Sequence, residues 1–440
     1  MGCDFYAVTL PNPLAAQQEI TNSAEYDYAV GVQNLSPGIA TSISISGGAL
    51  TSPQIVQLTA GASQTVVLPK VDTLWQSPGT KVVIGGAYHI VASNPILTLQ
   101  YNTINPVSGS NDASLLVPIE SAGTSFRVLV WPTADLAGGS LYPGQLGIVA
   151  TRSGTTVQIQ ASSAVFQVGA GLTATGGSIT LNAGDVLLLA SAATTGADSS
   201  GTLITSNAPI LVWSSHSGAQ VPAGTGYADY LETLLPPIAA LGNDYFVARP
   251  ANPPGSTTGA QQYVKLVGTV NGTNLVFDPS ITGAPATLQA GSAYTFPTTK
   301  DFHLQSDHPI VVAQFMEGGS VYGVANTDGD PSETITVPTA QARTSVTFYA
   351  PQIFTPNYAQ VIAPTGAAVT VDGAAVTGWT SIGSSGYAVA NYLLCCTDAH
   401  QATGDHPFLM SVYSYPPGFT SYWYPAALGI ADDIFADGFD

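Results

Sequence analysis

Residues 209–213 of this chain are Pro-Ile-Leu-Val-Trp, a short apolar run that begins at a proline. Similar closing runs begin at Pro95, Pro309 and Pro407, so successive prolines lie 114, 100 and 98 residues apart. A second kind of apolar run, which ends in a proline, opens each round at residues 5–11, 126–132, 245–250 and 346–351. Periodicity on this scale indicates a tandem array of four similar units.

Inside each round, the short segments have the pattern of β-strands. Residues 156–160 alternate between polar and apolar side chains, residues 185–189 form a nearly continuous apolar run, and Ser153-Gly154 is typical of a tight turn. About seven such segments in about 100 residues favour a small β-sandwich. We therefore expect an all-β protein of four tandem β-sandwich-like repeats without amphipathic helices. A four-bladed β-propeller is the alternative.

Clusters of Gly, Asn and Asp separate the rounds and predict where the repeats end. The predicted repeats cover residues 1–110, 111–228, 229–330 and 331–428. Residues 429–440 form an acidic and aromatic tail that belongs to no repeat, and we expect either an unstructured terminus or a docking tag.

The chain has few charges, and most of them are negative. Charged residues make up 8% of the 440 residues, against about 25% in an average protein, and the net charge is −19. Nucleic acid and anionic membranes are therefore poor partners. No apolar stretch is long enough for a transmembrane helix. The scarcity of lysine and the abundance of Ser, Thr and Gly favour an exported protein, located outside the cell or at its surface.

Three cysteines are too few for a disulfide framework. We expect Cys3 to bridge to the last repeat, at Cys395 or more specifically Cys396. The alternatives are a disulfide between the adjacent Cys395 and Cys396, or a metal site.

Catalytic motifs are missing from the sequence. The six histidines have no metal-ligand spacing, and neither a Gly-x-Ser-x-Gly motif nor a phosphate-binding loop occurs. His308 and His406 stand at equivalent places in two repeats, which favours a structural role. We therefore expect no enzyme activity.

Two groups of residues are candidates for binding. Asp328, Asp330 and Glu333 form the densest group of carboxylates, which would suit calcium, although an aspartate at a joint also caps turns. Calcium is the one cofactor considered. Aromatic side chains crowd near the end of the chain and predict either a binding surface or packing of the last repeat: Tyr413, Tyr415, Tyr422 and Trp423.

Several segments resemble the IgGFc-binding protein N-terminal domain family, and the opening of the chain is similar to its bacterial members. They are residues 110–118 (SNDASLLVP), 229–237 (DYLETLLPP), 329–338 (GDPSETITVP) and 421–425 (SYWYP). Trp423, Ala426 and Ala427 stand where the family usually has glycines. The resemblance covers nearly all of residues 1–428 and implies an exported protein, since most bacterial members carry the domain on exported proteins whose ligand is not established. It does not extend to immunoglobulin binding, because no contact residues can be matched.

The leading hypothesis is an exported, non-enzymatic binding or adhesion protein. Its partner would be a glycan, a mucin-like protein or another extracellular protein. A structural protein that assembles with copies of itself is the first alternative. A glycan-active hydrolase is the second, and it would need two carboxylates about 5–9.5 Å apart that face a cleft.

Overall fold

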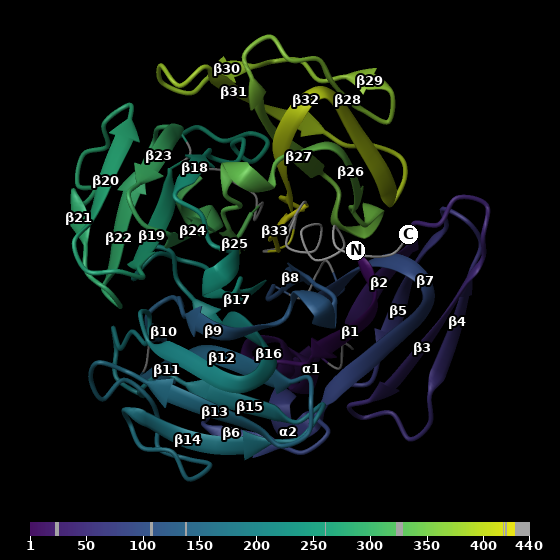
Figure 1. Cartoon of the computed structure of the whole chain (residues 1–440), viewed down its shortest axis with the longest axis vertical. Helices are drawn as coiled ribbons and strands as arrows, with labels where there is room; N and C mark the ends of the chain where they lie inside the picture. The colour runs from purple at the N-terminus through teal and green to yellow at the C-terminus, as the bar shows by residue number, and fades with distance from the viewer. Residues whose placement is uncertain are drawn as a thin grey trace.

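Four long strands organise the fold, and each joins shorter strands in antiparallel pairing (Figure 1). The start of a long strand pairs with the strand of an opening run, its later part with a middle strand, and its end with a short inner strand. In the third round a break divides the long strand in two. The long strands are β7 (Ala87–Asn102), β16 (Leu203–Ala219), β23 (Phe302–Ser306) with β24 (Ile310–Met316), and β32 (Ala399–Ser414).

The computed structural model describes residues 1–22, 26–105, 109–136, 139–259, 261–322, 329–416, 418 and 420–426. We number four units by their long strands, with β1–β8 in unit 1, β9–β17 in unit 2, β18–β25 in unit 3 and β26–β33 in unit 4.

The remaining strands of units 1 and 2 are short. In unit 1 they are β1 (Gly2–Val8), β2 (Tyr28–Asn34), β3 (Thr41–Gly47), β4 (Gln54–Leu58), β5 (Ser63–Leu68), β6 (Lys81–Val83) and β8 (Asp112–Leu115). In unit 2 they are β9 (Gly123–Arg127), β10 (Ala134–Leu136), β11 (Ser140–Tyr142), β12 (Gly144–Ala150), β13 (Thr155–Gln160), β14 (Gly176–Leu181), β15 (Val186–Ala190) and β17 (Asp229–Leu234).

Units 3 and 4 follow the same order. Unit 3 adds β18 (Asp244–Val247), β19 (Gln262–Gly268), β20 (Thr273–Asp278), β21 (Thr287–Leu288), β22 (Ala293–Thr298) and β25 (Glu333–Ile335). Unit 4 adds β26 (Arg343–Tyr349), β27 (Asn357–Pro364), β28 (Val369–Val371), β29 (Ala374–Ala375), β30 (Thr380–Ser381), β31 (Tyr387–Leu393) and β33 (Tyr422–Pro425).

These sheets confirm the prediction of an all-β protein. Short 3₁₀ turns connect several strands: η1 (Ile119–Ser121), η2 (Ile238–Ala240), η3 (Gly319–Tyr322), η4 (Thr339–Gln341) and η5 (Gln352–Phe354). The predicted repeat boundaries at residues 110, 228 and 330 fall just before the inner strands β8, β17 and β25. In the sheets, each of these strands pairs with the preceding long strand.

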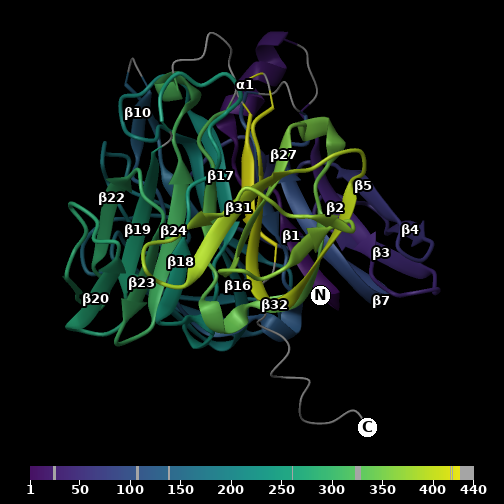
Figure 2. The same ribbon diagram turned by 90° about the horizontal axis from the view of Figure 1, so that it is seen from above.

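Two α-helices, α1 (Pro13–Asn22) and α2 (Asp72–Trp75), were not expected from the sequence. Helix α1 projects at one end of the molecule (Figure 2). The Asn12 side chain caps it, because its Oδ1 accepts the N–H of Ala15 at 3.2 Å. Pro13 then occupies the first helical position, where its missing N–H costs nothing. The Asn-Pro pair was therefore a usable signal. Neither helix is long and apolar enough to cross a membrane, which holds for the described residues.

The units share their hydrophobic cores. Neighbouring units contribute buried side chains to one cluster at each seam: units 1 and 2 around Trp213, units 2 and 3 around Phe315, units 3 and 4 around Leu409, and units 4 and 1 around Tyr101. The fourth seam closes a ring (Figure 1). The sandwich-like units are therefore parts of one packed body and not a row of separately packed repeats.

The opening runs form the seams. Each run packs against one position of the next unit's middle strand, which is β2, β12, β19 or β27. The register makes these positions equivalent, because they face Leu99, Trp213, Ala313 and Ser411 on the long strands. The contacts join Leu10 to Gly147, Val130 to Lys265, Arg249 to Gln360 and Tyr349 to Gly31.

Candidate functional site at the centre of the ring

The four inner strands β8, β17, β25 and β33 meet at the centre of the ring (Figure 1). Each contacts the next, and β33 contacts β8 again. Their register on the long strands defines one equivalent position in all four, at Ala113, Glu232, Glu333 and Trp423. Segments that the sequence indicated as joints between units are thus the innermost strands of the fold.

The carboxylate of Asp112 joins these four strands. The side chain is fully buried and accepts one backbone N–H from each inner strand, always at the equivalent position, and one hydroxyl. The donors are Ala113 N (2.9 Å), Glu232 N (3.1 Å), Glu333 N (3.2 Å), Trp423 N (3.3 Å) and Ser332 Oγ (2.8 Å). Burial raises the pKa of Asp112, and the donors oppose that shift. Asp112 is therefore a structural acceptor.

Two buried glutamates flank Asp112. Glu232 Oε2 accepts the hydroxyl of Tyr230 at 2.8 Å and the amide of Gln100 at 3.0 Å. Burial raises the pKa of Glu232 to about 8. Burial likewise raises the pKa of Glu333 to about 8, although Ser214 and Lys265 lower it. Neither oxygen of Glu333 has a hydrogen-bond partner. Both side chains are fully buried, which favours their neutral form.

Asp229 and Asp330 form a second pair of buried carboxylates near the same inner strands. Asp229 Oδ1 accepts the N–H groups of Asn111 (2.6 Å) and Tyr230 (2.7 Å), whereas its Oδ2 has no partner. Both oxygens of Asp330 also lack a hydrogen bond. Burial raises the pKa of both groups, and the charge of Asp330 raises that of Asp229 further.

The calcium prediction concerned Asp328, Asp330 and Glu333. Asp328 lies outside the described residues, and the other two are buried with unpaired oxygens. Over the described ranges, no group of three or more His, Cys, Asp or Glu side chains is arranged to hold a metal ion. Calcium binding stays a prediction.

The expected aromatic binding surface is wrong. Tyr413, Tyr415, Tyr422 and Trp423 are each at most 1% exposed. Tyr413 stacks on Tyr358, and the others pack edge to face within the seams of unit 4. The aromatic residues cluster near the end of the chain because they pack the last inner strand. This packing is the alternative that the sequence left open.

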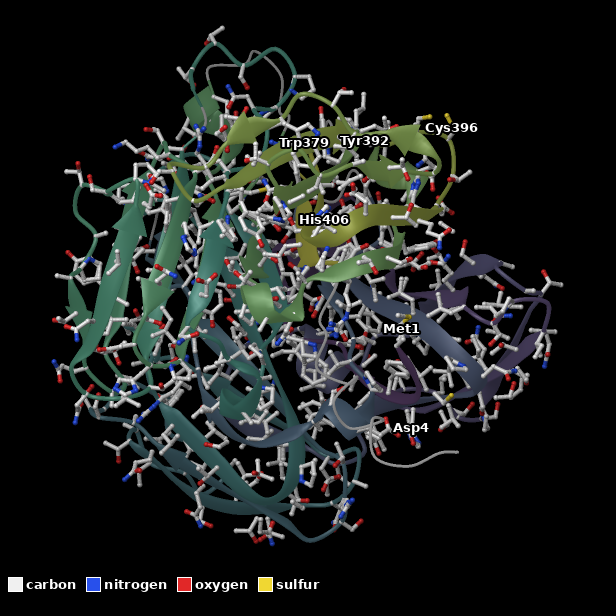
Figure 3. All side chains as sticks on the ribbon, turned by 45° about the horizontal axis from the view of Figure 1, so that its top comes forward. Met1, Asp4, Trp379, Tyr392, Cys396 and His406 are labelled. Atoms are coloured by element: carbon white, nitrogen blue, oxygen red, sulfur yellow. The ribbon has the colours of Figure 1, made fainter. Side chains whose placement is uncertain are left out.

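The predicted Cys3–Cys396 bridge is not formed, because all three cysteines are free thiols. Cys3 is partly buried in β1, and Cys395 and Cys396 are exposed. Met1 and Asp4, which flank Cys3 in the chain, lie well apart from Cys396 (Figure 3). Separation of β1 from this part of unit 4 explains the missing bridge.

Three histidines that looked scattered in the sequence are equivalent in the structure. Each stands on a long strand, stacks on an aromatic ring of the opening run and contacts an aspartate, as His89 does with Tyr6 and Asp4. The other two sets are His303 with Phe246 and Asp244, and His400 with Phe348 and Asp372. Recurrence at one packing position indicates a structural role.

A pocket lies between the inner strands of units 3 and 4. It is a small hollow with room for about 30 Å³, roughly one or two water molecules, and it is partly open to solvent. Its wall combines apolar side chains with amides and hydroxyls and has no charged side chain: Phe246, Gln314, Thr334, Ile335, Thr336, Val337, Gln360, Ile362, Leu409, Met410, Ser411 and Pro425.

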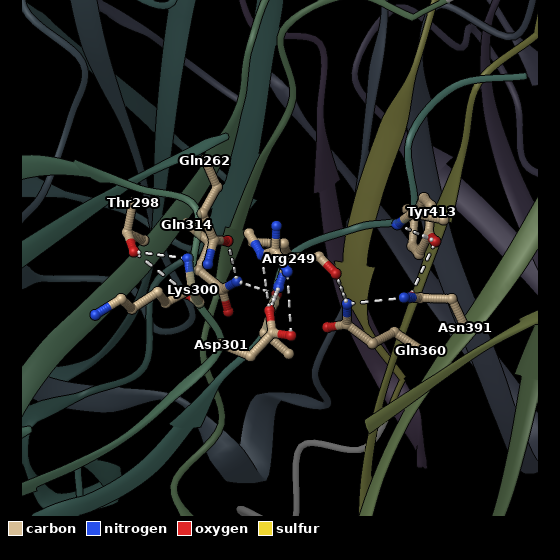
Figure 4. Close-up of polar contacts among 11 residues, drawn as sticks. Arg249, Gln262, Thr298, Lys300, Asp301, Gln314, Gln360, Asn391 and Tyr413 are labelled. Carbon is tan, nitrogen blue, oxygen red and sulfur yellow. Dashed lines mark hydrogen bonds and ion pairs between the residues drawn. The ribbon is translucent and has the colours of Figure 1, made fainter. Parts of the chain in front are cut away.

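Hydrogen bonds hold the two amides of the pocket in place. Gln314 Nε2 donates to Ala248 O (2.7 Å), and Gln360 Nε2 donates to Arg249 O (2.7 Å) and to Asn391 (3.2 Å) (Figure 4). The Thr334 hydroxyl is different, since it is buried and has no partner in the protein. The pocket therefore combines fixed amides with one free hydroxyl.

Among the comparisons with known proteins, the family match agrees with the sequence resemblance. No curated protein matches the chain. One solved structure, an anti-sigma factor domain-containing protein from Clostridium clariflavum, is 8% identical, covers 88% of this chain and 98% of its own, and has a TM-score of 0.13, which is too low to support any argument. The family described as IgGFc binding protein matches residues 112–414, more than half of the chain. The chain therefore belongs to the IgGFc-binding protein family.

Proposed function

We propose that this protein is an exported, non-enzymatic binding protein and that the small hollow between units 3 and 4 takes one hydroxyl group of an uncharged ligand, specifically of a glycan. Membership in a binding family supports the general function. The closed ring supports a rigid scaffold, because shared cores fix the two units that line the pocket.

The composition of the pocket wall carries the proposal. All of its polar side-chain groups are amides or hydroxyls, which match a hydroxyl of a neutral sugar. A hydrolase would need two carboxylates in the cleft, and the wall contains none. A mucin-like partner would present the same sugars on a protein, whereas a bare protein partner or self-assembly would use the outer surface.

The Thr334 hydroxyl allows a clean test. Binding of neutral oligosaccharides to the full chain is screened on a glycan array, and hits are measured by calorimetry. Thr334→Val should weaken binding about tenfold, as expected for one lost hydrogen bond of about 1.4 kcal/mol, without lowering the melting temperature. Thr98→Val is the matched control, because Thr98 also has a buried, unpartnered hydroxyl but lies in unit 1.

Two outcomes would overturn the proposal. One is an array on which no neutral glycan binds, and the other is a glycan whose affinity is equal for the wild type, Thr334→Val and Thr98→Val.

A further inference from the structure

Lys265 occupies an unusual position at the seam of units 2 and 3. Its side chain is fully buried, and it reaches out of β19 into unit 2. There Nζ lies 2.6 Å from Asp198 Oδ2 and 2.6 Å from the carbonyl oxygen of Val130. The chain has three other lysines, all of them exposed or partly so: Lys70, Lys81 and Lys300.

A buried lysine is a potential nucleophile. Burial lowers the pKa of the Lys265 amine, and Asp198 and Glu333 offset part of this shift. A desolvated amine with a lowered pKa is the form in which lysine attacks carbonyl carbon. Direct contact with the Asp198 carboxyl also supplies the reacting group at a high effective concentration.

Glu333 completes the arrangement. In the sheet, Lys265 pairs with Ala313, and Ala313 pairs with Ile335. Glu333 lies two residues from Ile335 along β25, so it is on the same face of the sheet as Lys265. It is fully buried, neither of its oxygens has a hydrogen-bond partner, and it interacts electrostatically with Lys265. The lysine ammonium has three N–H donors, of which Asp198 and Val130 use two.

We propose that Lys265 and Asp198 form an intramolecular isopeptide bond that covalently joins unit 2 to unit 3, with Glu333 as a positioning residue that acts on Lys265 through its charge. The Lys265 ammonium first passes a proton to the Asp198 carboxylate that it contacts, which leaves a neutral amine and a neutral Asp198 acid. Nζ then attacks Cγ of Asp198, the C–N bond forms and one C–O bond breaks. The leaving oxygen takes one hydrogen from the acid and one from the amine and departs as water. No oxidant or cofactor is required.

The surroundings of Lys265 and Asp198 suit a reaction that releases water. The Asp198 side chain is 30% exposed, so the released water has a path to solvent, while the amine stays in the dry interior. The ion pair between Lys70 and Glu19 lacks a buried amine, because the Lys70 side chain is 20% exposed and that of Glu19 is 23% exposed. That pair is an internal control within the same protein.

Mass spectrometry of the denatured full chain tests the proposal. The intact mass should be lower than the sequence mass by one water molecule. Cleavage after glutamate should leave fragments 121–232 and 233–317 joined through Asp198 and Lys265, and trypsin should fail to cut after Lys265. Peptides that contain Lys70 should be unmodified. Hydroxylamine treatment separates this bond from a succinimide, which also loses water but reopens.

Variants assign the roles. Lys265→Arg keeps the positive charge but cannot form the amide, so it should have its full sequence mass. Glu333→Gln should leave most of the chain unlinked. An intact wild-type mass equal to that of the sequence, or separate fragments after cleavage, would overturn the bond without affecting the proposed glycan pocket. Complete linkage in Glu333→Gln would overturn the role of Glu333.

Discussion

Asp112 receives one backbone N–H from its own strand and one from each of three strands distant in the sequence, and the partner on β33 is 311 residues away. Because the acceptor is buried, water cannot replace it easily. The contribution of this residue to stability should therefore exceed that of an ordinary buried polar side chain.

Asp112→Ala should lower the free energy of unfolding by about 3–5 kcal/mol, since several buried donors would lose their acceptor together. Chemical denaturation measures this change. Ser114→Ala is the control, because Ser114 lies on the same strand and its hydroxyl makes only a long contact to Leu115 O (3.4 Å). Equal losses in both variants would contradict the central role of Asp112.

The buried glutamates predict how stability depends on pH. The folded-state pKa values of Glu232 and Glu333, about 8, lie above their ordinary value of 4.5. The folded protein therefore holds protons that the unfolded chain releases, and stability falls as pH rises from about 4.5 to about 8. His216, whose pKa burial lowers to about 4, opposes this trend only below about pH 6.5.

Raising the pH from about 6.5 to about 8 should cost about 2 kcal/mol for each glutamate. Urea titrations across this range measure the loss. Glu232→Gln, which can still accept from Tyr230, should reduce the slope, while Glu120→Gln on the surface should leave it unchanged. A stability that rises with pH over this range would contradict the assignment.

At the scale of elements, the seams depend on close approach between an opening run and a middle strand. A Cβ atom on Gly147 would lie 2.6 Å from Cδ2 of Leu10, closer than packed atoms allow. Gly147→Ala should thus cost about 1–3 kcal/mol by overpacking the seam of units 1 and 2. Gly259→Ala is the control, because a Cβ there would meet no atom within 4 Å. Thermal melts of both variants measure this loss. Equal midpoints for Gly147→Ala and Gly259→Ala would contradict close packing at this seam.

The sequence predicted the opening and closing runs as strands, because their apolar pattern is dictated by burial in a sheet. It missed the inner strands, because Asp112, Asp229 and Asp330 marked those segments as polar joints. A carboxylate that is buried beside backbone donors cannot be distinguished from a turn cap by residue type alone. The register that aligns Glu232 with Glu333 likewise depends on pairing between distant segments.

At the scale of the whole molecule, the shared cores predict cooperative unfolding. Each unit buries part of its apolar surface only against its neighbours, so a single unit would lose that burial if another unfolded. Differential scanning calorimetry should show one transition, with equal calorimetric and van't Hoff enthalpies. Resolved steps would indicate the independent sandwiches that we first expected.

A clue to this sharing was present in the sequence. The strands β12, β15 and β24 are buried along their whole length, and their apolar runs are nearly continuous. An isolated sandwich with one solvated face would show alternation instead. Such runs indicate that both faces are covered but not which element covers them, so the closed ring could not be derived from the pattern.

The position of Asp112 also limits how this ring could have arisen by duplication. Four identical copies of unit 1 would bring four carboxylates to one point, where their mutual repulsion would be severe. Identical copies of unit 3, with Ser332 near the centre, would bring none. One acceptor shared by four strands requires the copies to differ, so the central contact breaks the fourfold symmetry that the backbone preserves. The units are consequently not interchangeable. Replacing unit 1 with a copy of another unit would remove the Asp112 acceptor from the centre of the ring.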